Sequence, residues 1–393
     1  MTKAVLWGVR LSPFYLKLEA CLQFSRFPYQ RLPVHGSRIE NLKYLASLEQ
    51  AKRNHSIKRY PQRDPQLDEY PSVPFFSTAD EGLQFDSSSI AHWLDDHKQS
   101  EDNTPALRPN TPTLSFLSHL IDEAFDEFGL YMVHHMRWVG SAKSQEMGKR
   151  LGQEFKTALP PGGAMFLSKS FPKRQVRRCP YLFSVAPKGY QAGVSSALNP
   201  PSRDGFPETH TLLNHCWKQY VRSVDAVLQQ QPYLLGERFT LADASVYGQL
   251  AMNLVDKEAA DKLLALAPTT FNWLQKIEHG KHVPSPMENT ELVISPLLKG
   301  LLNTIMGTFS ALMVQNEKAY QLAWEQGERT FNETAFDNGK ALYDGQILGY
   351  PFRAVVKTFQ VRVWREIKAH WKSLPPSSKE ELSTLIDVCE LFE

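Results

Sequence analysis

The chain has 393 residues, which is long enough for two or three domains with a sizeable hydrophobic core. Its 44 Lys and Arg residues nearly balance its 42 Asp and Glu residues, so no overall charge attracts a polyanion and nucleic acid is not expected as a partner. The four cysteines lie far apart without metal-ligand spacing, which argues against structural zinc and a disulfide framework and suits a reducing cytoplasm.

The beginning of the chain predicts a strand, a turn and a helix. An apolar run over 5–9 is typical of a first strand and lacks the long apolar core of a secretory leader. Ser12 is a good N-cap and Pro13 suits the first helical position, because proline has no N–H that would be left unpaired there. Further elements are predicted as strands at 29–34, 73–76 and 83–85 and a helix at 87–97.

This order of elements is the thioredoxin-like arrangement, and the motifs along it resemble the N-terminal domain of cytosolic glutathione transferases. Three motifs carry the resemblance: Ser12-Pro13-Phe14, Val73-Pro74 and Asp86-Ser87. The Ser-Pro-Phe triplet is similar to that of the tau-type enzymes. The resemblance implies a cytoplasmic, homodimeric enzyme with glutathione as co-substrate and no metal.

The resemblance also implies a role for each motif. Ser12 is expected to donate a hydrogen bond to the sulfur of glutathione, and a helix N-terminus favours the thiolate as well. Val73 is expected to pair through its backbone with the cysteinyl segment, next to a cis Pro74. Asp86 and Ser87 are expected to hold the γ-glutamyl end, the acid facing its ammonium and the serine its carboxylate.

Simpler interpretations stay open for the same residues. Ser12 and Asp86 are also good helix caps, and Pro74 suits the edge of any strand. Ser12 and Tyr15 stand where redox proteins of this fold carry cysteines, so disulfide exchange is disfavoured. Phe14 and Tyr15 are candidates for the substrate pocket.

A long segment between the second and third strands, over 36–70, contains a basic cluster. Its basic residues are candidates for binding the glycyl carboxylate of glutathione, although a run of solvent-exposed charges is the simpler interpretation. The candidates are Lys52, Arg53, Lys58 and Arg59.

A helix over 114–138 is predicted next, with apolar residues at helical spacing. Its acidic residues and histidines lack the Glu-x-x-His spacing of di-iron bundles, so no metal is expected. This stretch is similar to a bacterial group of long, unassigned transferase-like proteins, and by resemblance the helix borders the electrophile pocket. Tyr131, His135 and Arg137 are therefore candidates for that pocket, or alternatively for a buried polar brace.

The predicted helical domain covers 101–283, with a Pro- and Gly-rich insertion at 141–207 that is either a lid or a surface excursion. Thr240 and Asp243 have capping-box spacing and match a helix start in the second domain of the same family. A helical extension over 284–393 is expected to pack on this domain, with helices near 295–315, 317–330 and 352–371.

Two details of the extension are predicted separately. The apolar stretch 292–314 is interrupted by Pro296 and Lys299, which indicates a buried helix rather than a membrane span. Residues 349–352, with the sequence Gly-Tyr-Pro-Phe, are expected to form a rigid aromatic turn.

The sequence thus predicts an α/β thioredoxin-like domain over 1–100, followed by an all-α transferase domain with a helical extension. The expected function is a glutathione transferase that activates the glutathione thiolate for attack on a hydrophobic electrophile, by conjugation, dehalogenation or ether cleavage. A glutathione-binding protein without turnover and a glutathione-dependent thiol reductase are the alternatives.

Overall fold

The computed structural model describes residues 4–60, 67, 70–97, 105–283 and 291–393, so the predicted domain boundaries near 100 and 284 adjoin or lie outside the described residues. The N-terminal part contains a four-stranded sheet in the order β2-β1-β3-β4. The strands are β1 (Ala4–Trp7), β2 (Tyr29–Leu32), β3 (Phe75–Thr78) and β4 (Gly82–Phe85). β1 is parallel to β2, whereas β3 is antiparallel to both β1 and β4.

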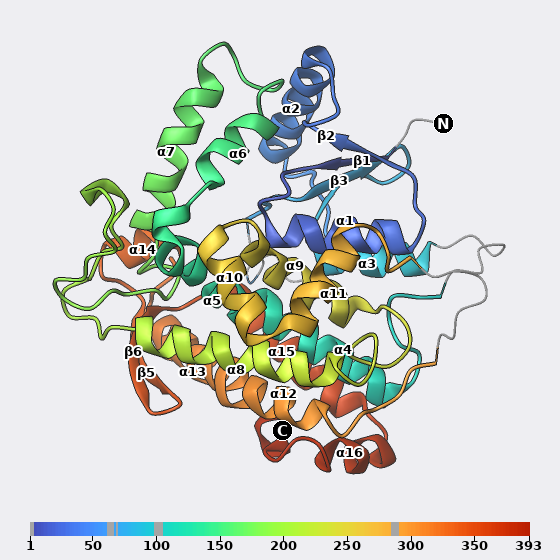
Figure 1. Ribbon diagram of the computed structural model, residues 1–393. Coiled ribbons are helices and arrows are strands. Elements are labelled where there is room, and N and C mark those ends of the chain that lie inside the picture. The colour runs from blue at the N-terminus through green and yellow to red at the C-terminus, as the bar shows by residue number, and fades with distance from the viewer. Residues whose placement is uncertain (1–3, 61–66, 68–69, 98–104, 284–290) are drawn as a thin grey trace.

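Helices cover both faces of this sheet. They are α1 (Pro13–Phe24), α2 (Arg38–Arg53) and α3 (Ser87–Asp96). α1 and α3 lie together on one face and α2 lies on the other (Figure 1). The thioredoxin-like arrangement is therefore confirmed. α2 was not predicted, although the capping box between Ser37 and Glu40 at its start is a local signal for it.

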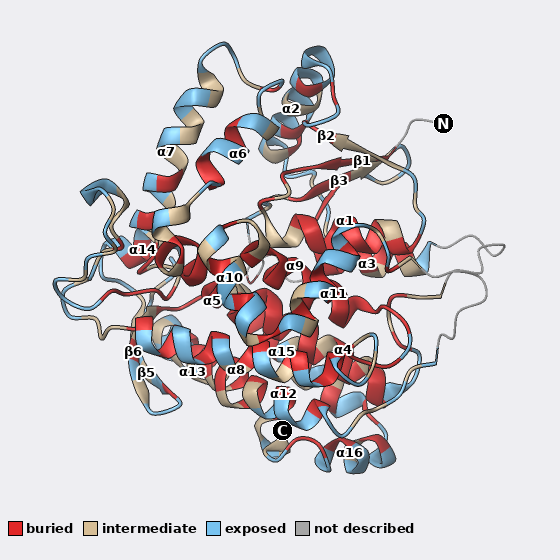
Figure 2. Ribbon diagram, viewed as in Figure 1, coloured by how far each residue is buried: buried red, intermediate tan, exposed pale blue. Residues whose placement is uncertain are grey.

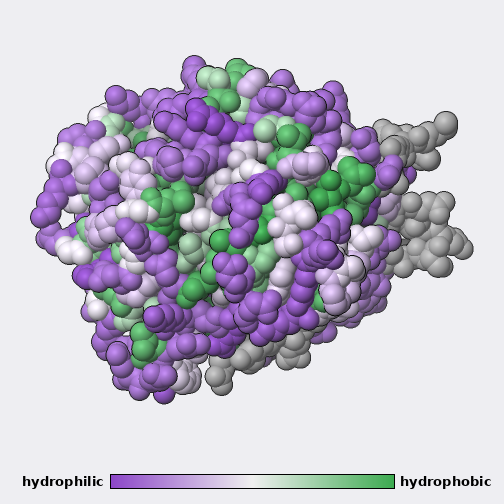
Figure 3. Space-filling view, turned by 90° about the horizontal axis from the view of Figure 1, so that it is seen from below, coloured by the Kyte–Doolittle hydropathy of each residue, from purple (hydrophilic) through white to green (hydrophobic). Residues whose placement is uncertain are grey.

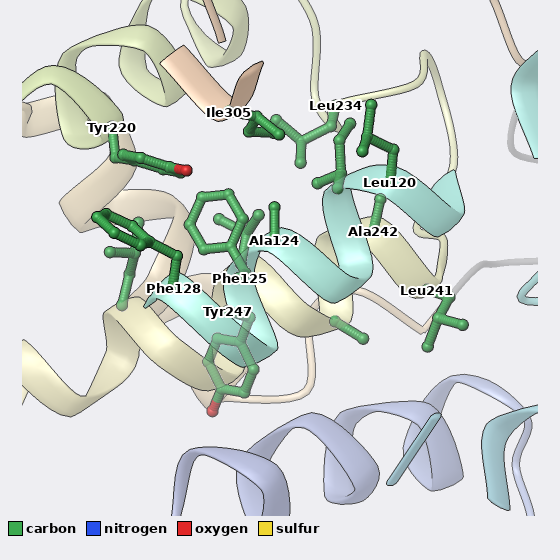
Figure 4. Close-up of a cluster of buried hydrophobic side chains, with 14 of the residues drawn as sticks. Leu120, Ala124, Phe125, Phe128, Tyr220, Leu234, Leu241, Ala242, Tyr247 and Ile305 are labelled. Atoms are coloured by element: carbon green, nitrogen blue, oxygen red, sulfur yellow. The ribbon is translucent and has the colours of Figure 1, made fainter. Parts of the chain in front are cut away.

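The helical part begins with one continuous helix over residues 112–140. It consists of α4 (Pro112–Ala124), a π-helical segment (Phe125–Gly129), α5 (Leu130–His135) and a second π-helical segment (Met136–Gly140). Phe125 and Phe128 pack against Tyr220 of α8 (His210–Leu228), with ring centroids 5.3 and 6.1 Å away (Figure 4). The predicted burial of this helix is confirmed.

α9 (Leu241–Leu250) joins the helical part to the sheet domain. Every residue of α9 is buried, and the predicted capping box of Thr240 and Asp243 forms at its start. It packs closely against α1, because a Cβ added at Gly248 would lie only 2.5 Å from the carbonyl oxygen of Pro13. α10 (Lys257–Leu266) and α11 (Pro268–Glu278) follow.

The insertion folds into a helical hairpin of α6 (Met147–Glu154) and α7 (Gly163–Arg177), followed by a long irregular segment. Much of α7 is exposed (Figure 2). The hairpin contacts the sheet domain, since the backbone N–H of Arg10 donates to Glu154 Oε2 at 3.0 Å and Asn41 Nδ2 donates to Thr157 Oγ1 at 3.0 Å.

The C-terminal extension contains several elements that were not predicted, among them a β-hairpin and two short helices. Residues 298–325 form a continuous helix, made of α12 (Leu298–Ile305), a π-helical segment (Met306–Ser310) and α13 (Ala311–Glu325). A hairpin of β5 (Leu342–Ile347) and β6 (Tyr350–Val355) then precedes α15 (Thr358–Ser373). The predicted helix was expected from residue 352 but begins only at Thr358. The predicted aromatic turn at 349–352 was wrong as well, because Tyr350 to Val355 form a strand that pairs with β5. α14 (Glu333–Asp337) and α16 (Pro376–Ser383) complete the extension.

The extension packs on the helical part: α12 contacts α8, and α15 contacts α4. Among the described residues, no helix combines the length and apolar character needed to cross a membrane. On the face seen from below, hydrophilic residues predominate and hydrophobic ones occur in separate groups (Figure 3).

Candidate functional site

A cavity of about 90 Å³ lies at the N-terminal end of α3. Its walls come from α1, the segment before β3, the start of α3, the first π-helical segment and α15. Among its lining residues are five that the sequence singled out: Phe14, Val73, Pro74, Asp86 and Ser87. The peptide bond between Val73 and Pro74 is cis, as the resemblance implied.

Asp86 is the N-cap of α3. Its backbone has a φ of 74°, and its Oδ1 accepts a hydrogen bond from the N–H of Ser89 at 2.9 Å. Arg59 Nε donates to Asp86 Oδ2 at 2.7 Å. Although burial opposes ionisation, the charges of Arg59 and Arg362 together with the capping hydrogen bond lower the pKa of Asp86. Asp86 is therefore an ionised cap with both oxygens engaged.

The basic cluster contributes one residue to this end of α3. The backbone of Lys58 pairs with β4, through hydrogen bonds of 2.9 Å to Leu83 O and 3.1 Å from Phe85 N, and this pairing brings Arg59 beside Asp86. Lys58 itself lies 3.7 Å from Glu81, and Lys52 lies 3.2 Å from Glu49. The cavity-lining residues include none of Lys52, Arg53, Lys58 and Arg59 within the described part of the chain, so the glycyl-carboxylate role stays a prediction.

A buried ionic cluster lies directly behind the cavity, and sequence reasoning missed it. Lys17 of α1 is fully buried, and its Nζ lies 2.5 Å from Asp122 Oδ1, 2.6 Å from Asp126 Oδ2 and 2.6 Å from Ser88 Oγ. Burial raises the pKa of Asp126 to about 8; the charge of Asp122 acts in the same direction and that of Lys17 opposes it. The only signal in the sequence is a lysine between Leu16 and Leu18 on an apolar helix.

Ser12 is the N-cap residue of α1 and is half-buried. Its Oγ accepts a hydrogen bond of 3.4 Å from the N–H of Tyr15, so the capping role is present. The ring of Tyr15 is buried and its hydroxyl accepts a hydrogen bond of 3.3 Å from Arg31 Nε. Neither Ser12 nor Tyr15 is among the described residues that line the cavity, and the thiolate role of Ser12 stays a prediction.

Tyr131, His135 and Arg137 are buried and hydrogen-bonded away from the cavity. The Tyr131 hydroxyl accepts from Gln360 at 2.9 Å, and His135 Nδ1 lies 2.9 Å from Ser184 Oγ. Arg137 donates to the carbonyl oxygen of Leu11 at 3.1 Å. These contacts agree with the buried polar brace that was the alternative for these three residues, and both roles stay predictions.

The C-terminal extension supplies a wall of the cavity, which the sequence did not indicate. α15 lies beside α4 and places Phe359 and Arg362 in the lining (Figure 1). Gln360 fixes this position, because its Nε2 donates to Glu127 Oε2 at 3.0 Å as well as to the Tyr131 hydroxyl. In sequence, Arg362 is one of several basic residues of an amphipathic helix and carries no individual signal.

In the described part of the chain, no three or more His, Cys, Asp and Glu side chains are grouped so that they could hold a metal ion. The cavity is lined by carboxylates, serine hydroxyls and the guanidinium of Arg362, which is itself 3.1 Å from Glu366.

The architecture, a thioredoxin-like sheet domain followed by an all-helical part, is the fold of glutathione transferases. No family model and no curated protein matches the chain.

Similar solved structures include a glutathione S-transferase of Ceriporiopsis subvermispora in complex with glutathione, at 15% identity over 72% of this chain and 100% of that chain, with a TM-score of 0.42. Glutathione transferase GSTFuA3 from Phanerochaete chrysosporium gives 14% identity, coverage of 72% and 100%, and a TM-score of 0.43. The beta-etherase LigF from Sphingobium sp. strain SYK-6 gives 16% identity, coverage of 70% and 95%, and a TM-score of 0.41.

Proposed function

We propose that the chain is a glutathione transferase that binds glutathione at the cavity before α3 and directs its thiolate at a hydrophobic electrophile. One observation carries the proposal. Phe14, Val73, Pro74, Asp86 and Ser87 come from three segments far apart in the sequence, and all five line the same cavity. The resemblance to glutathione transferases assigns each of these residues to glutathione or to its substrate.

The start of α1 suits the thiolate step. A thiol of pKa about 8.5 is mostly protonated at neutral pH, so an enzyme must favour the anion. A hydroxyl has one proton to donate and two lone pairs to accept with. The cap uses one lone pair of Ser12, and Ser12 Oγ donates no hydrogen bond to any described residue, so its proton is available to a sulfur anion.

In the reaction, the sulfur electron pair forms a bond to an electrophilic carbon and a halide, alkoxide or carbanion takes the electrons of the broken bond. Conjugation, dehalogenation and ether cleavage share this step. The reductase alternative needs a reactive thiol in the protein. Cys21, Cys179 and Cys216 are buried and Cys389 is half-buried, and burial raises the pKa of all four thiols. These observations support the transferase over the reductase.

The test is retention of the protein on immobilised glutathione together with conjugation of 1-chloro-2,4-dinitrobenzene. We expect retention, and a kcat/KM that falls about 10- to 100-fold in Ser12→Ala, the size of one hydrogen bond to a charged group. Full activity of Ser12→Ala would contradict the mechanism. A protein that neither binds glutathione nor conjugates the aryl halide is no transferase of this kind, and turnover of a mixed disulfide alone would favour the reductase.

A further inference from the structure

A second pocket lies at the insertion, and its described lining residues include none of those that line the cavity at α3. Its volume is about 570 Å³. Its walls come from α6, α7, the second π-helical segment, a short 3-10 helix (Ala142–Ser144) and residues 194–198. Pockets that bind small molecules usually measure ~300–1,000 Å³, so this one is large enough for such a ligand.

The charged side chains that line this pocket are all basic, and we name it the lysine pocket. They are Lys143, Lys149, Lys169 and Lys173, and no Asp or Glu is among the described lining residues. Lys149 lies 3.6 Å from Glu146, but both side chains are more than half exposed, so this ion pair is weak. The other three ammonium groups form no ion pair or hydrogen bond with any described residue. The protein therefore supplies no anion to balance this positive charge.

The interior of the lysine pocket is apolar. Trp138 and Val176 are 3% and 4% exposed, and Pro172 of α7 is buried as well. Val194 and Leu198 add two half-buried apolar side chains from the irregular segment that follows α7. The four lysines, in contrast, are exposed. The charge thus lies toward the rim of the pocket and the apolar surface lies deeper.

Close packing between α6 and α7 holds one side of the pocket in place. The two helices lie side by side (Figure 1). A Cβ added at Gly148 would overlap the carbonyl oxygen of Ser168, and one added at Gly152 would lie 2.6 Å from the carbonyl oxygen of Ala164. The glycines of α6 therefore allow the backbones of the two helices to approach each other.

The irregular segment on the other side is closed by hydrogen bonds of its own. Asn199 accepts from the N–H of Ala192 at 2.8 Å and donates to the carbonyl oxygen of Tyr190 at 2.9 Å. Gly193 within this loop has a φ of 72°, and a Cβ added there would lie 2.7 Å from Cε of Lys143. The stem of Lys143 therefore packs against the loop, and the pocket is a defined part of the fold.

These features together define the chemistry of a ligand. Lysine ammonium groups donate strong hydrogen bonds to carboxylate, sulfonate and phosphate oxygens. Burial of apolar surface adds about 25 cal/mol for each Å² that is removed from water. A neutral apolar ligand would leave the lysines without an anion, and a small inorganic anion would leave the apolar interior in contact with water. A molecule that combines an anionic group with an apolar body satisfies both parts of the pocket.

We propose that the lysine pocket binds a small amphipathic organic anion. Its apolar body lies against Trp138 and Leu198, and its carboxylate or other anionic group lies at the rim. Lys169 and Lys173 are four residues apart on α7, so both ammonium groups are on one face of the helix and can serve the same anion. The inference goes beyond the proposed function and does not depend on it.

The test compares two ligands of nearly the same shape that differ in charge. 4-Biphenylacetate and the neutral 4-biphenylacetamide are measured by equilibrium dialysis against the full-length protein. We expect the wild type to bind the carboxylate about 10-fold more tightly than the amide, and the difference to shrink at ~0.5 M NaCl, because exposed charges are screened. The double variant Lys169→Gln/Lys173→Gln should bring the ratio of the two affinities close to one.

Arg174→Gln/Arg177→Gln is the matched control, because it removes two charges from exposed residues of the same helix that do not line the pocket. It should keep the wild-type ratio. Leu198→Ala removes apolar contact without changing the charge, so it should weaken the binding of both ligands alike, by about 3- to 10-fold.

Four results would overturn the inference. A wild-type ratio near one, or no binding of either ligand, does so whatever the variants show. Equal effects of the lysine and arginine double variants would mean that the general charge of α7 attracts the anion. Displacement of 4-biphenylacetate by S-methylglutathione would place it in the cavity at α3 instead. Failure of the protein to bind glutathione would overturn the proposed function and leave this inference intact.

Discussion

Arg59 Nε donates a hydrogen bond of 2.7 Å to Asp86 Oδ2. A basic residue from the segment between β2 and β3 thus binds the N-cap residue of α3. The side chain of Arg59 is 7% exposed and that of Asp86 is 21% exposed. The pair is thus largely withdrawn from water, and the guanidinium of Arg59 stabilises the ionised form of Asp86.

Arg59→Met is expected to lower the free energy of unfolding by about 1–3 kcal/mol, because Asp86 then keeps a largely buried charge without its main donor. Urea denaturation at pH 7 measures the change. The exposed Arg53→Met is the matched control and should change stability by less than about 0.5 kcal/mol. Adding Asp86→Asn to Arg59→Met should recover part of the loss, and equal effects of Arg53→Met and Arg59→Met would contradict the pairing.

Ser12 combines capping with the proposed donation to sulfur, and two substitutions separate these roles. Ser12→Ala removes both, so stability should fall by about 1 kcal/mol and kcat/KM should fall as well. Ser12→Asn keeps a good N-cap but has no hydroxyl, so stability should stay near that of the wild type while conjugation falls. Thermal unfolding and aryl halide conjugation are measured on the same preparations. Activity that follows stability in both variants would make Ser12 a cap and nothing more.

Gly248→Ala tests the contact between α9 and α1. The added Cβ would lie 2.5 Å from the Pro13 carbonyl oxygen, a backbone atom that cannot rotate away, so the helices must separate. We expect a loss of about 1–3 kcal/mol despite the higher helix propensity of alanine. Gly300→Ala in α12 is the control, because the nearest atom to its added Cβ is 4.0 Å away. Urea denaturation compares the two, and an equal effect would contradict the close packing.

His134 predicts how stability depends on pH. It is 8% exposed, and burial lowers its pKa to about 3, with the charges of Arg178 and Arg137 adding to the effect and a hydrogen bond to Gln175 opposing it. The unfolded chain takes up a proton near pH 6.5, whereas the folded chain does so only near pH 3. Between these values the unfolded state binds more protons, so acidification lowers the free energy of unfolding.

The His134 contribution is at most about 1.4 kcal/mol per pH unit for one proton. His134→Gln should therefore show a smaller loss of stability between pH 7 and pH 5 than the wild type, as measured by urea denaturation at both values. The exposed His279→Gln should leave the loss unchanged. A pH dependence of His134→Gln identical to that of the wild type would show that His134 does not stay neutral in the folded protein.

The features that could be predicted from the sequence are those with local signals. The start of α1 follows from a cap and a proline at adjacent positions, and the start of α9 follows from Thr240 and Asp243 three residues apart. In the structure Asp243 accepts hydrogen bonds from the N–H groups of Leu234 and Thr240 at 2.8 and 2.9 Å. The strands were found because apolar runs alternate with turns.

The features that were missed depend on pairs far apart in the chain. Lys17 and Asp126 are 109 residues apart, and each alone resembles an ordinary charge on a helix. Arg59 reaches Asp86 through the pairing of Lys58 with β4, which composition does not reveal. The hairpin of β5 and β6 turns at Leu348 and Gly349, both with positive φ, and leucine is an unusual residue for that conformation. Its strands were therefore not recognised.

The wall that α15 adds to the cavity has a consequence for biosynthesis. Chains fold from the N-terminus as they leave the ribosome, so the sheet domain can form before the C-terminal extension has been made. Arg362, however, is made 236 residues after Asp126, as the difference between the two positions shows. The cavity at the start of α3 is completed only when nearly the whole polypeptide has been synthesised, so nascent and C-terminally shortened chains lack the wall that Phe359 and Arg362 supply.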